Sequence, residues 1–162
     1  MRPAASASAL RVQAVLGDGF EVLEFESSTR TAADAAAAIG CNVGQIAKSL
    51  IFRAKKSGRP VLAIASGSVR VDESRLSELL GEDIGRADAA FVKEQTGFAI
   101  GGVPPVGHDN EPIIFIDEAL LRFETIWAAA GTPNSVFRLT PDDLLGLTDG
   151  TVASIAIQEG PA

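Results

Sequence analysis

Several residue types are scarce in this chain, and each scarcity excludes a class of protein. Cys41 is the sole cysteine among 162 residues, so no disulfide can form within the chain, which fits a reducing compartment. No apolar run approaches the roughly 20 residues that a membrane helix needs. The N-terminus holds one arginine in its first ten residues and no apolar segment of the signal type. These absences predict a soluble, cytoplasmic protein without a membrane partner.

Positive charge is also in short supply, and it is spread unevenly. With 14 basic and 21 acidic residues the formal net charge is −7, which argues against indiscriminate nucleic-acid binding and against a DNA partner. Residues 48–75 nevertheless hold seven basic residues against two acidic ones, a local charge of +5, so the remainder carries −12. Such an island can guide one polyanion to one place, or its charges can keep a hairpin edge from aggregating. Four of its members cluster tightly: Arg53, Lys55, Lys56 and Arg59.

The apolar pattern alternates between helical and extended segments along the whole chain. Residues 45–54 and 60–66 read as two strands of a hairpin, because a polar turn joins them. Further strands are predicted at 20–25, 113–116, 125–129, 135–138 and 152–157, and helices at 6–16, 31–39, 72–80, 87–95, from 117 and from 140. No linker or repeat divides them. The sequence therefore predicts a single α+β domain over 1–162 with a mixed sheet.

A glycine- and proline-rich segment at residues 97–108 carries the strongest local signal. It contains four glycines, two prolines, no acidic residue and the only histidine. It lacks the lysine of a Walker loop and the spacing of a dinucleotide fingerprint. One interpretation is a tight structural loop without a ligand. The other is a surface that presents main-chain groups to a ligand, because glycine allows close approach and positive φ; the apolar run at 99–103 favours this second interpretation.

Lys48 is the second informative position. On a strand over 45–54, alternation places it on one face with Ile46 and Leu50. Lysine is almost never fully buried without a partner. Its ammonium must therefore either line a pocket or extend past the apolar side chains to solvent.

Taken in order, these segments resemble the YbaK/prolyl-tRNA-synthetase-associated domains, which are free-standing editing deacylases. The resemblance runs from about residue 29 to 157. The matching pieces are 31–40, 45–52, 71–76, 97–107, 116–118, 130–134 and 142–144. It implies a mixed, mostly antiparallel sheet, partly closed into a barrel with surrounding helices. It also implies hydrolysis of the ester between a wrong amino acid and the 3′-terminal adenosine of a tRNA, with no cofactor and no metal.

The resemblance carries two motifs over to this chain. The lysine of the family's strand falls on Lys48, and the G-x-x-x-P loop falls on residues 101–105. In relatives the backbone amides of that loop hold the aminoacyl carbonyl, and the lysine helps to position the terminal nucleotide. Ester hydrolysis builds negative charge on the carbonyl oxygen, which preorganised N–H donors stabilise. Proline has no N–H. The expected catalytic donors are therefore Gly101, Gly102 and Val103, with Pro104 and Pro105 keeping the turn rigid.

Other positions receive more modest roles. His108 stands beside Asp109 without a serine or cysteine motif, so we expect it at the rim of the pocket or on the surface rather than as a general base. Cys41 has no histidine in its motif and is not expected to be a nucleophile. The expected contacts with substrate are Ser28, Thr29, Ser66 and Gly67, together with Pro104, Pro105 and His108. The expected helix caps are Asp72, Asp117 and Asp142.

We therefore expect trans-editing of mischarged aminoacyl-tRNA. The targets implied are a small amino acid such as Ala or Cys on proline tRNA, or a Ser- or Thr-type product. The partner is the 3′-terminal adenosine and acceptor end of the tRNA, contacted by the basic cluster. The alternative is a tRNA- or synthetase-binding module without catalysis, and whether an aminoacyl-tRNA synthetase recruits the chain stays open.

Overall fold

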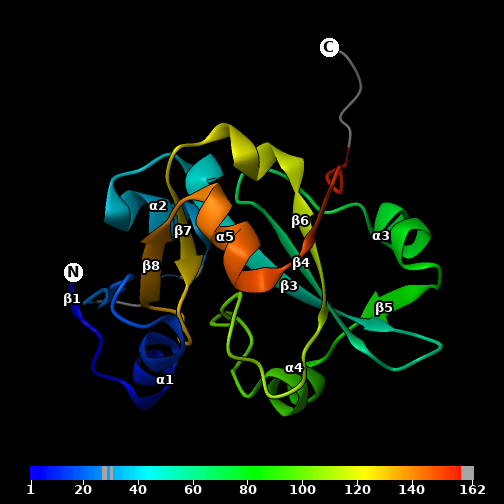
Figure 1. Cartoon of the computed structure of the whole chain (residues 1–162), viewed down its shortest axis with the longest axis horizontal. Coiled ribbons are helices and arrows are strands. Elements are labelled where there is room, and N and C mark those ends of the chain that lie inside the picture. Colours follow the sequence, from blue (N-terminus) through cyan, green and yellow to red (C-terminus); the bar gives the residue numbers. More distant parts are fainter. Residues whose placement is uncertain (27–28, 30, 158–162) are drawn as a thin grey trace.

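The computed structural model describes residues 1–26, 29 and 31–157, and it shows one mixed sheet with helices set around it (Figure 1). The strands are β1 (Arg2–Pro3), β2 (Val22–Glu24), β3 (Ile46–Ala54), β4 (Pro60–Ser66), β5 (Ile84–Arg86), β6 (Ile113–Asp117), β7 (Ile126–Ala129), β8 (Ser135–Leu139) and β9 (Thr151–Ala153). The helices are α1 (Ala7–Leu16), α2 (Ala32–Ile39), α3 (Glu73–Leu80), α4 (Ala89–Thr96) and α5 (Pro141–Thr148), with 3-10 turns η1 (Val43–Gln45) and η2 (Glu118–Arg122).

The sheet runs in the order β1-β2-β8-β7-β3-β4-β6-β9, and β5 pairs with β3 off this path. Parallel pairing joins β3 to β7, β4 to β6 and β6 to β9, and the other five pairings are antiparallel. The expected α+β class and mixed, mostly antiparallel sheet are confirmed. No pairing between β1 and β9 is found among the described residues, so partial closure into a barrel stays a prediction.

Side-chain caps explain where the helices begin. An oxygen of Ser6, Thr31, Asp72, Asp88 and Thr140 accepts a hydrogen bond from the main chain of the first turn of α1, α2, α3, α4 and α5 respectively. The predicted cap at Asp72 is thus confirmed.

The cap predicted at Asp142 is wrong, whereas Asp117 occupies the N-cap position of η2 without a side-chain cap bond. Asp142 lies inside the first turn of α5, which Thr140 caps together with Asp143. Asp117 makes no cap bond, because its buried carboxylate instead accepts from the Ile155 amide at 3.0 Å.

Short elements account for most differences from the sequence-based expectation. The strands β1 and β5 and the turn η1 were not anticipated, since two or three residues are too few to show a period. The strand expected at 152–157 is shorter, at Thr151–Ala153, and continues only as an isolated bridge between Val71 and Ala156.

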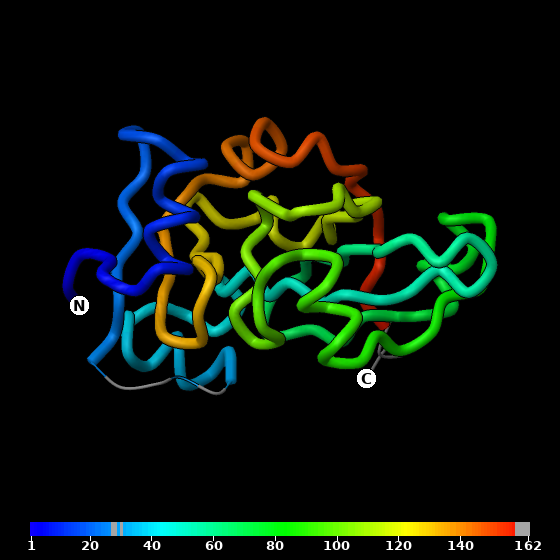
Figure 2. The backbone as a smooth tube through the Cα atoms, turned by 90° about the horizontal axis from the view of Figure 1, so that it is seen from below, coloured from blue at the N-terminus to red at the C-terminus, as the bar shows by residue number. Residues whose placement is uncertain are grey.

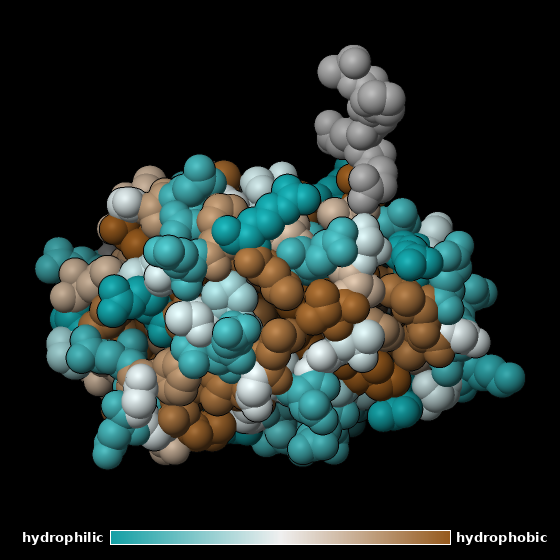
Figure 3. Space-filling view, turned by 45° about the horizontal axis from the view of Figure 1, so that its top comes forward, coloured by the Kyte–Doolittle hydropathy of each residue, from teal (hydrophilic) through white to brown (hydrophobic). Residues whose placement is uncertain are grey.

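Apolar residues pack on both faces of β3 and β4. On β4, Leu62 and Ile64 belong to one buried cluster, whereas Ala63 and Ala65 belong to another. Every residue of β4 is buried, and this strand lies between β3 and β6 in the sheet. The β3–β4 hairpin protrudes at the end of the molecule away from the N-terminus (Figure 2). In the space-filling view an apolar band crosses the middle of the face shown, bordered by hydrophilic side chains (Figure 3).

Candidate functional site

The sheet has a gap along one edge of β3. The opposite edge of this strand is paired with β4 from Ala47 to Arg53. On the gapped edge, β7 pairs only with Ile46 and Ala47, and β5 pairs only from Phe52 to Ala54. Residues 48–51 therefore have no neighbouring strand on that side.

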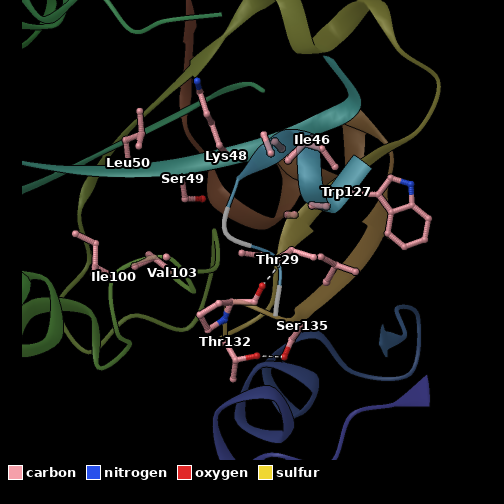
Figure 4. Close-up of a pocket in the computed structure, with 18 of the residues that line it drawn as sticks. Thr29, Ile46, Lys48, Ser49, Leu50, Ile100, Val103, Trp127, Thr132 and Ser135 are labelled. Atoms are coloured by element: carbon pink, nitrogen blue, oxygen red, sulfur yellow. Dashed lines mark hydrogen bonds between the residues drawn. The ribbon is translucent and has the colours of Figure 1, made fainter. Parts of the chain in front are cut away.

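A cavity of about 390 Å³ lies at this gap. Its lining includes residues 46–51 of β3, the end of β7, and Ile100, Gly101 and Val103 of the glycine-rich segment. Val103 is 3% exposed, whereas Ile100 is 59% exposed, so the first lies in the wall and the second at the mouth. Figure 4 shows both of them across the space from β3. The fold thus brings the two sequence motifs, the strand and the loop, to one cavity.

Lys48 lines the cavity, but its side chain points to the side of β3 away from Val103 (Figure 4). It is half-buried, and its Nζ donates a hydrogen bond to the Val69 carbonyl oxygen. Figure 4 shows Lys48 and Ser49 on opposite sides of the β3 ribbon, with Ser49 on the side of Val103. Desolvation by burial lowers the pKa of Lys48. The cation is thus held close to the cavity by a neutral oxygen, with no carboxylate within 4 Å among the described residues.

The glycine-rich segment is a tight turn in which one amide is already used. The Gly102 amide donates to the Ala99 carbonyl at 3.1 Å, and the Gly102 carbonyl accepts from the Gly131 amide at 2.9 Å. A Cβ at Gly102 would come within 2.7 Å of the Thr132 backbone, so glycine is required there. Gly101 has φ of 92°. Among the described residues the amides of Gly101 and Val103 have no hydrogen-bond partner, and both residues line the cavity.

His108 supports this turn through a contact with its main chain. Its Nε2 lies 2.6 Å from the Pro104 carbonyl oxygen, to which it donates in the tautomer protonated at that nitrogen. Its ring also contacts Phe98 edge-on, and the Arg11 guanidinium lies 4.5 Å above the Phe98 ring. Burial lowers the pKa of His108, partly offset by the hydrogen bond to Pro104. The histidine does not line the cavity, and neither do Pro104 and Pro105, which are buried in the turn.

Of the positions expected to contact substrate, the fold places some in the cavity lining and others outside it. Thr29 lines the cavity, and its hydroxyl donates to the Pro133 carbonyl at 2.7 Å. Ser66 and Gly67 do not line it: the Ser66 hydroxyl donates to the Gly44 carbonyl at 2.7 Å, and the Gly67 amide to the Ile46 carbonyl at 2.7 Å. Both support the start of β3 from behind. Ser28 lies outside the described residues.

The basic cluster occupies the outer part of the β3–β4 hairpin. The Arg53 guanidinium lies 5.5 Å above the Phe91 ring of α4, two residues along β3 from the cavity-lining Ile51. At the turn, the Glu82 carboxylate accepts from the amides of Lys56 and Ser57 at 2.9 Å. Hydrogen bonding to these amides lowers the pKa of Glu82. The turn is therefore fixed by its backbone, and its basic side chains stay exposed.

Sequence reasoning missed several lining residues. Trp127 and the hydroxyl-bearing Ser49, Thr132 and Ser135 all line the cavity. Alternation along β3 places Ser49 on the face opposite Lys48, but it does not show that this face lines a cavity. Thr132 lies in the turn between β7 and β8, and it shares a short hydrogen bond with Ser135, the first residue of β8. No local pattern predicts that this turn brings both hydroxyls to the cavity.

Other chemistries find no support in residues 1–26, 29 and 31–157. No group of three or more His, Cys, Asp or Glu residues there could hold a metal ion. Burial raises the pKa of the Cys41 thiol, which disfavours the reactive thiolate. No helix in this part of the chain is long and apolar enough to span a membrane.

Comparison with known proteins points to one family. The pattern of the aminoacyl-tRNA editing domain matches residues 26–147. The protein YwhH of Bacillus subtilis, which is uncharacterized, is 38% identical over 124 residues, covering 76% of this chain and 78% of YwhH. EbsC of Enterococcus faecalis, provisionally named a Cys-tRNA(Pro)/Cys-tRNA(Cys) deacylase, is 27% identical over 132 residues, covering 80% and 79%. A crystal structure provisionally named a trans-editing enzyme for prolyl tRNA synthetase superposes with a TM-score of 0.90 at 46% identity, covering 97% of this chain and 100% of the other.

Proposed function

The chain belongs to the aminoacyl-tRNA editing domain family, and from that premise we propose that it hydrolyses mischarged aminoacyl-tRNA in trans. The observation that carries the proposal is the cavity between the open edge of β3 and the turn at Gly101–Val103. It is small and largely apolar, and on the loop side it has main-chain donors without a partner in the described part of the chain. This combination suits a small aminoacyl group whose ester carbonyl needs stabilisation.

We assign the oxyanion donors to Gly101 and Val103. When water adds to the ester carbonyl, its oxygen gains negative charge, and fixed N–H donors stabilise that charge without reorganisation. The C–O bond to the ribose then breaks, and the departing ribose oxygen takes up a proton while the amino acid leaves as a carboxylate. Gly102 uses its own amide and carbonyl to hold the turn, so its role is to position its neighbours.

We assign to Lys48 the placement of the terminal nucleotide. A half-buried ammonium beside the cavity, bonded only to a neutral carbonyl, can exchange that partner for an anionic one at little cost. The phosphate next to the terminal adenosine is such a partner. We therefore expect Lys48 to act on how the ester is positioned rather than as a base.

Cavity size would set the choice of amino acid. The volume of about 390 Å³ must also admit part of the ribose, which favours a small aminoacyl group such as Ala or Cys, or a Ser- or Thr-type group. Apolar pockets discriminate by only about 1–3 kcal/mol per methylene, so a synthetase that confuses such groups needs a second site.

A panel of charged tRNAs tests the proposal. Proline tRNA carrying Ala, Cys, Ser, Thr or cognate Pro is mixed with the protein, and release of each amino acid is compared with spontaneous hydrolysis. We expect accelerated release of at least one small non-cognate group and protection of Pro-tRNA. Tight tRNA binding with no accelerated release of any group would instead identify a binding module without catalysis.

A further inference from the structure

The unpaired stretch of β3 presents main-chain groups to the cavity. In an antiparallel pair, alternate residues direct both N–H and C=O toward the partner strand. The Ala54 amide donates to the Arg59 carbonyl at 2.9 Å, and the Ile46 carbonyl accepts from the Gly67 amide at 2.7 Å, so even-numbered residues of β3 face β4. Ser49 and Ile51 face the other edge, where neither β7 nor β5 is paired with them. Their N–H groups and the Ser49 carbonyl thus point into the gap.

The Ser49 hydroxyl is a second observation at the same place. Its Oγ is buried and has no hydrogen-bond partner among the described residues. The other hydroxyls on the cavity wall are occupied: Thr29 donates to Pro133, Thr31 accepts from Asp34, and Thr132 pairs with Ser135. A buried hydroxyl without a partner is costly, and a ligand that supplies one removes that cost.

The charge of the cavity restricts which group of a ligand can bind there. No acidic residue is found among its described lining residues, and Lys48 adds a positive charge. An aminoacyl ester carries a carbonyl oxygen as acceptor and an α-amino group as donor, on adjacent carbon atoms. Since the loop amides of Gly101 and Val103 suit the carbonyl, the α-amino group has only neutral oxygens to meet on the facing wall.

We propose that Ser49 is a substrate-recognition residue, whose main-chain carbonyl and hydroxyl accept hydrogen bonds from the α-amino group of a small aminoacyl ester at the open edge of β3. This inference rests on the proposed function. In this arrangement the substrate lies beside β3 in the gap between β7 and β5, where a neighbouring strand would otherwise pair. It lies between two rows of main-chain groups, the turn on one side and the strand edge on the other.

The first test uses a non-hydrolysable analogue, 3′-deoxy-3′-(alanylamino)adenosine, and amide NMR of the whole chain. We expect the amide resonances of Ser49 and Ile51 to shift on titration, together with those of Gly101 and Val103. Shifts at the loop without any at Ser49 and Ile51 would overturn this inference and leave the proposed function standing. Absence of any shift at the loop and at β3 would overturn both.

The second test compares the wild-type chain and Ser49→Ala in their affinity for the alanyl analogue and for an analogue without the amine, 3′-deoxy-3′-(propionylamino)adenosine. We expect Ser49→Ala to weaken the alanyl analogue about fivefold, the value of one hydrogen bond, and to leave the propionyl analogue unchanged. Ser74→Ala, an exposed serine on α3, is the matched control and should change neither affinity.

The Tm of the free protein distinguishes a role of Ser49 in substrate recognition from a role in stabilising the fold. Removing an unpartnered buried hydroxyl should leave the Tm of the free protein unchanged or raise it, even as affinity falls. Equal loss of affinity for both analogues, or a drop in Tm that accompanies the loss, would show that Ser49 acts on the fold and would overturn the inference.

Discussion

At the scale of single residues, the cavity depends on groups held by neutral partners. Lys48 donates to a carbonyl, and the amides of Gly101 and Val103 have no partner among the residues that the structure describes. Such groups can turn to a substrate without first breaking an ion pair. Lys48 and the loop could be predicted from the sequence, because a lysine on an apolar strand and a glycine cluster are both unusual. Ser49 could not, since a serine on a strand is ordinary until its pairing is known.

Replacing Lys48 by Met tests its role directly. We expect kcat/KM for mischarged tRNA to fall at least about tenfold, because the terminal nucleotide loses its cationic partner. Burial already disfavours the charged amine, so the Tm should hold or rise. Lys48→Arg keeps the charge and should recover part of the rate. Unchanged kinetics in Lys48→Met would remove this residue from the mechanism.

His108 should make stability depend on pH. Burial places its pKa in the folded state below the unfolded value of about 6.5. Between the two values the unfolded chain binds more protons, so stability is complete above the unfolded pKa and falls as pH falls through it. Urea midpoints at pH 7.5 and 5.5 measure this loss. It should be smaller in His108→Gln, and an equal loss in both proteins would contradict the assignment.

At the scale of elements, β3 organises the site. One edge is paired throughout with β4, and the other is left open between β7 and β5, which creates a cavity in a continuous sheet. The strand and hairpin were predictable from alternation and turn residues. The gap was not, because it depends on where distant short strands end, and β5 has only three residues.

The turn at residues 101–103 tolerates little change in its shape. In Gly102→Ala a Cβ would meet the Thr132 backbone at 2.7 Å, so we expect a loss of about 2 kcal/mol in unfolding free energy and a loss of activity. Gly146→Ala in α5 is the matched control: nothing lies within 4 Å of its Cβ, and helix propensity should add up to about 1 kcal/mol. Denaturant titration gives both values, and equal stability of the two variants would refute the close-packing argument.

The basic hairpin should govern tRNA affinity separately from chemistry. Changing Arg53, Lys55, Lys56 and Arg59 together to Gln should weaken tRNA binding and flatten its salt dependence, since each lost phosphate contact removes about 0.7–0.9 from the slope. Filter binding between 50 and 200 mM salt, roughly the range in which such contacts are felt, measures this. Arg138→Gln, exposed on β8, is the control. An unchanged slope would show that these charges do not contact tRNA and serve only to protect the hairpin edge from aggregation.

At the scale of the whole molecule, the basic cluster projects on the β3–β4 hairpin, whereas the rest of the chain is acidic. The cavity lies between these two parts, along strand β3. Arg53 and Ile51 are two residues apart on β3, the first over Phe91 and the second in the cavity wall. A tRNA end guided by the hairpin would therefore arrive at the cavity. The net charge of −7 opposes binding elsewhere, which favours low, local affinity over general attachment.

Hydrolysis at this cavity, rather than mere binding of the tRNA end, is what we propose for this protein. Single-turnover hydrolysis of Ala-tRNA(Pro), with protein in excess and tRNA binding followed in the same sample, tests it most directly. We expect bound ester to disappear faster than free ester, and Lys48→Met to slow this loss. Bound Ala-tRNA(Pro) that survives for as long as the free form would contradict it.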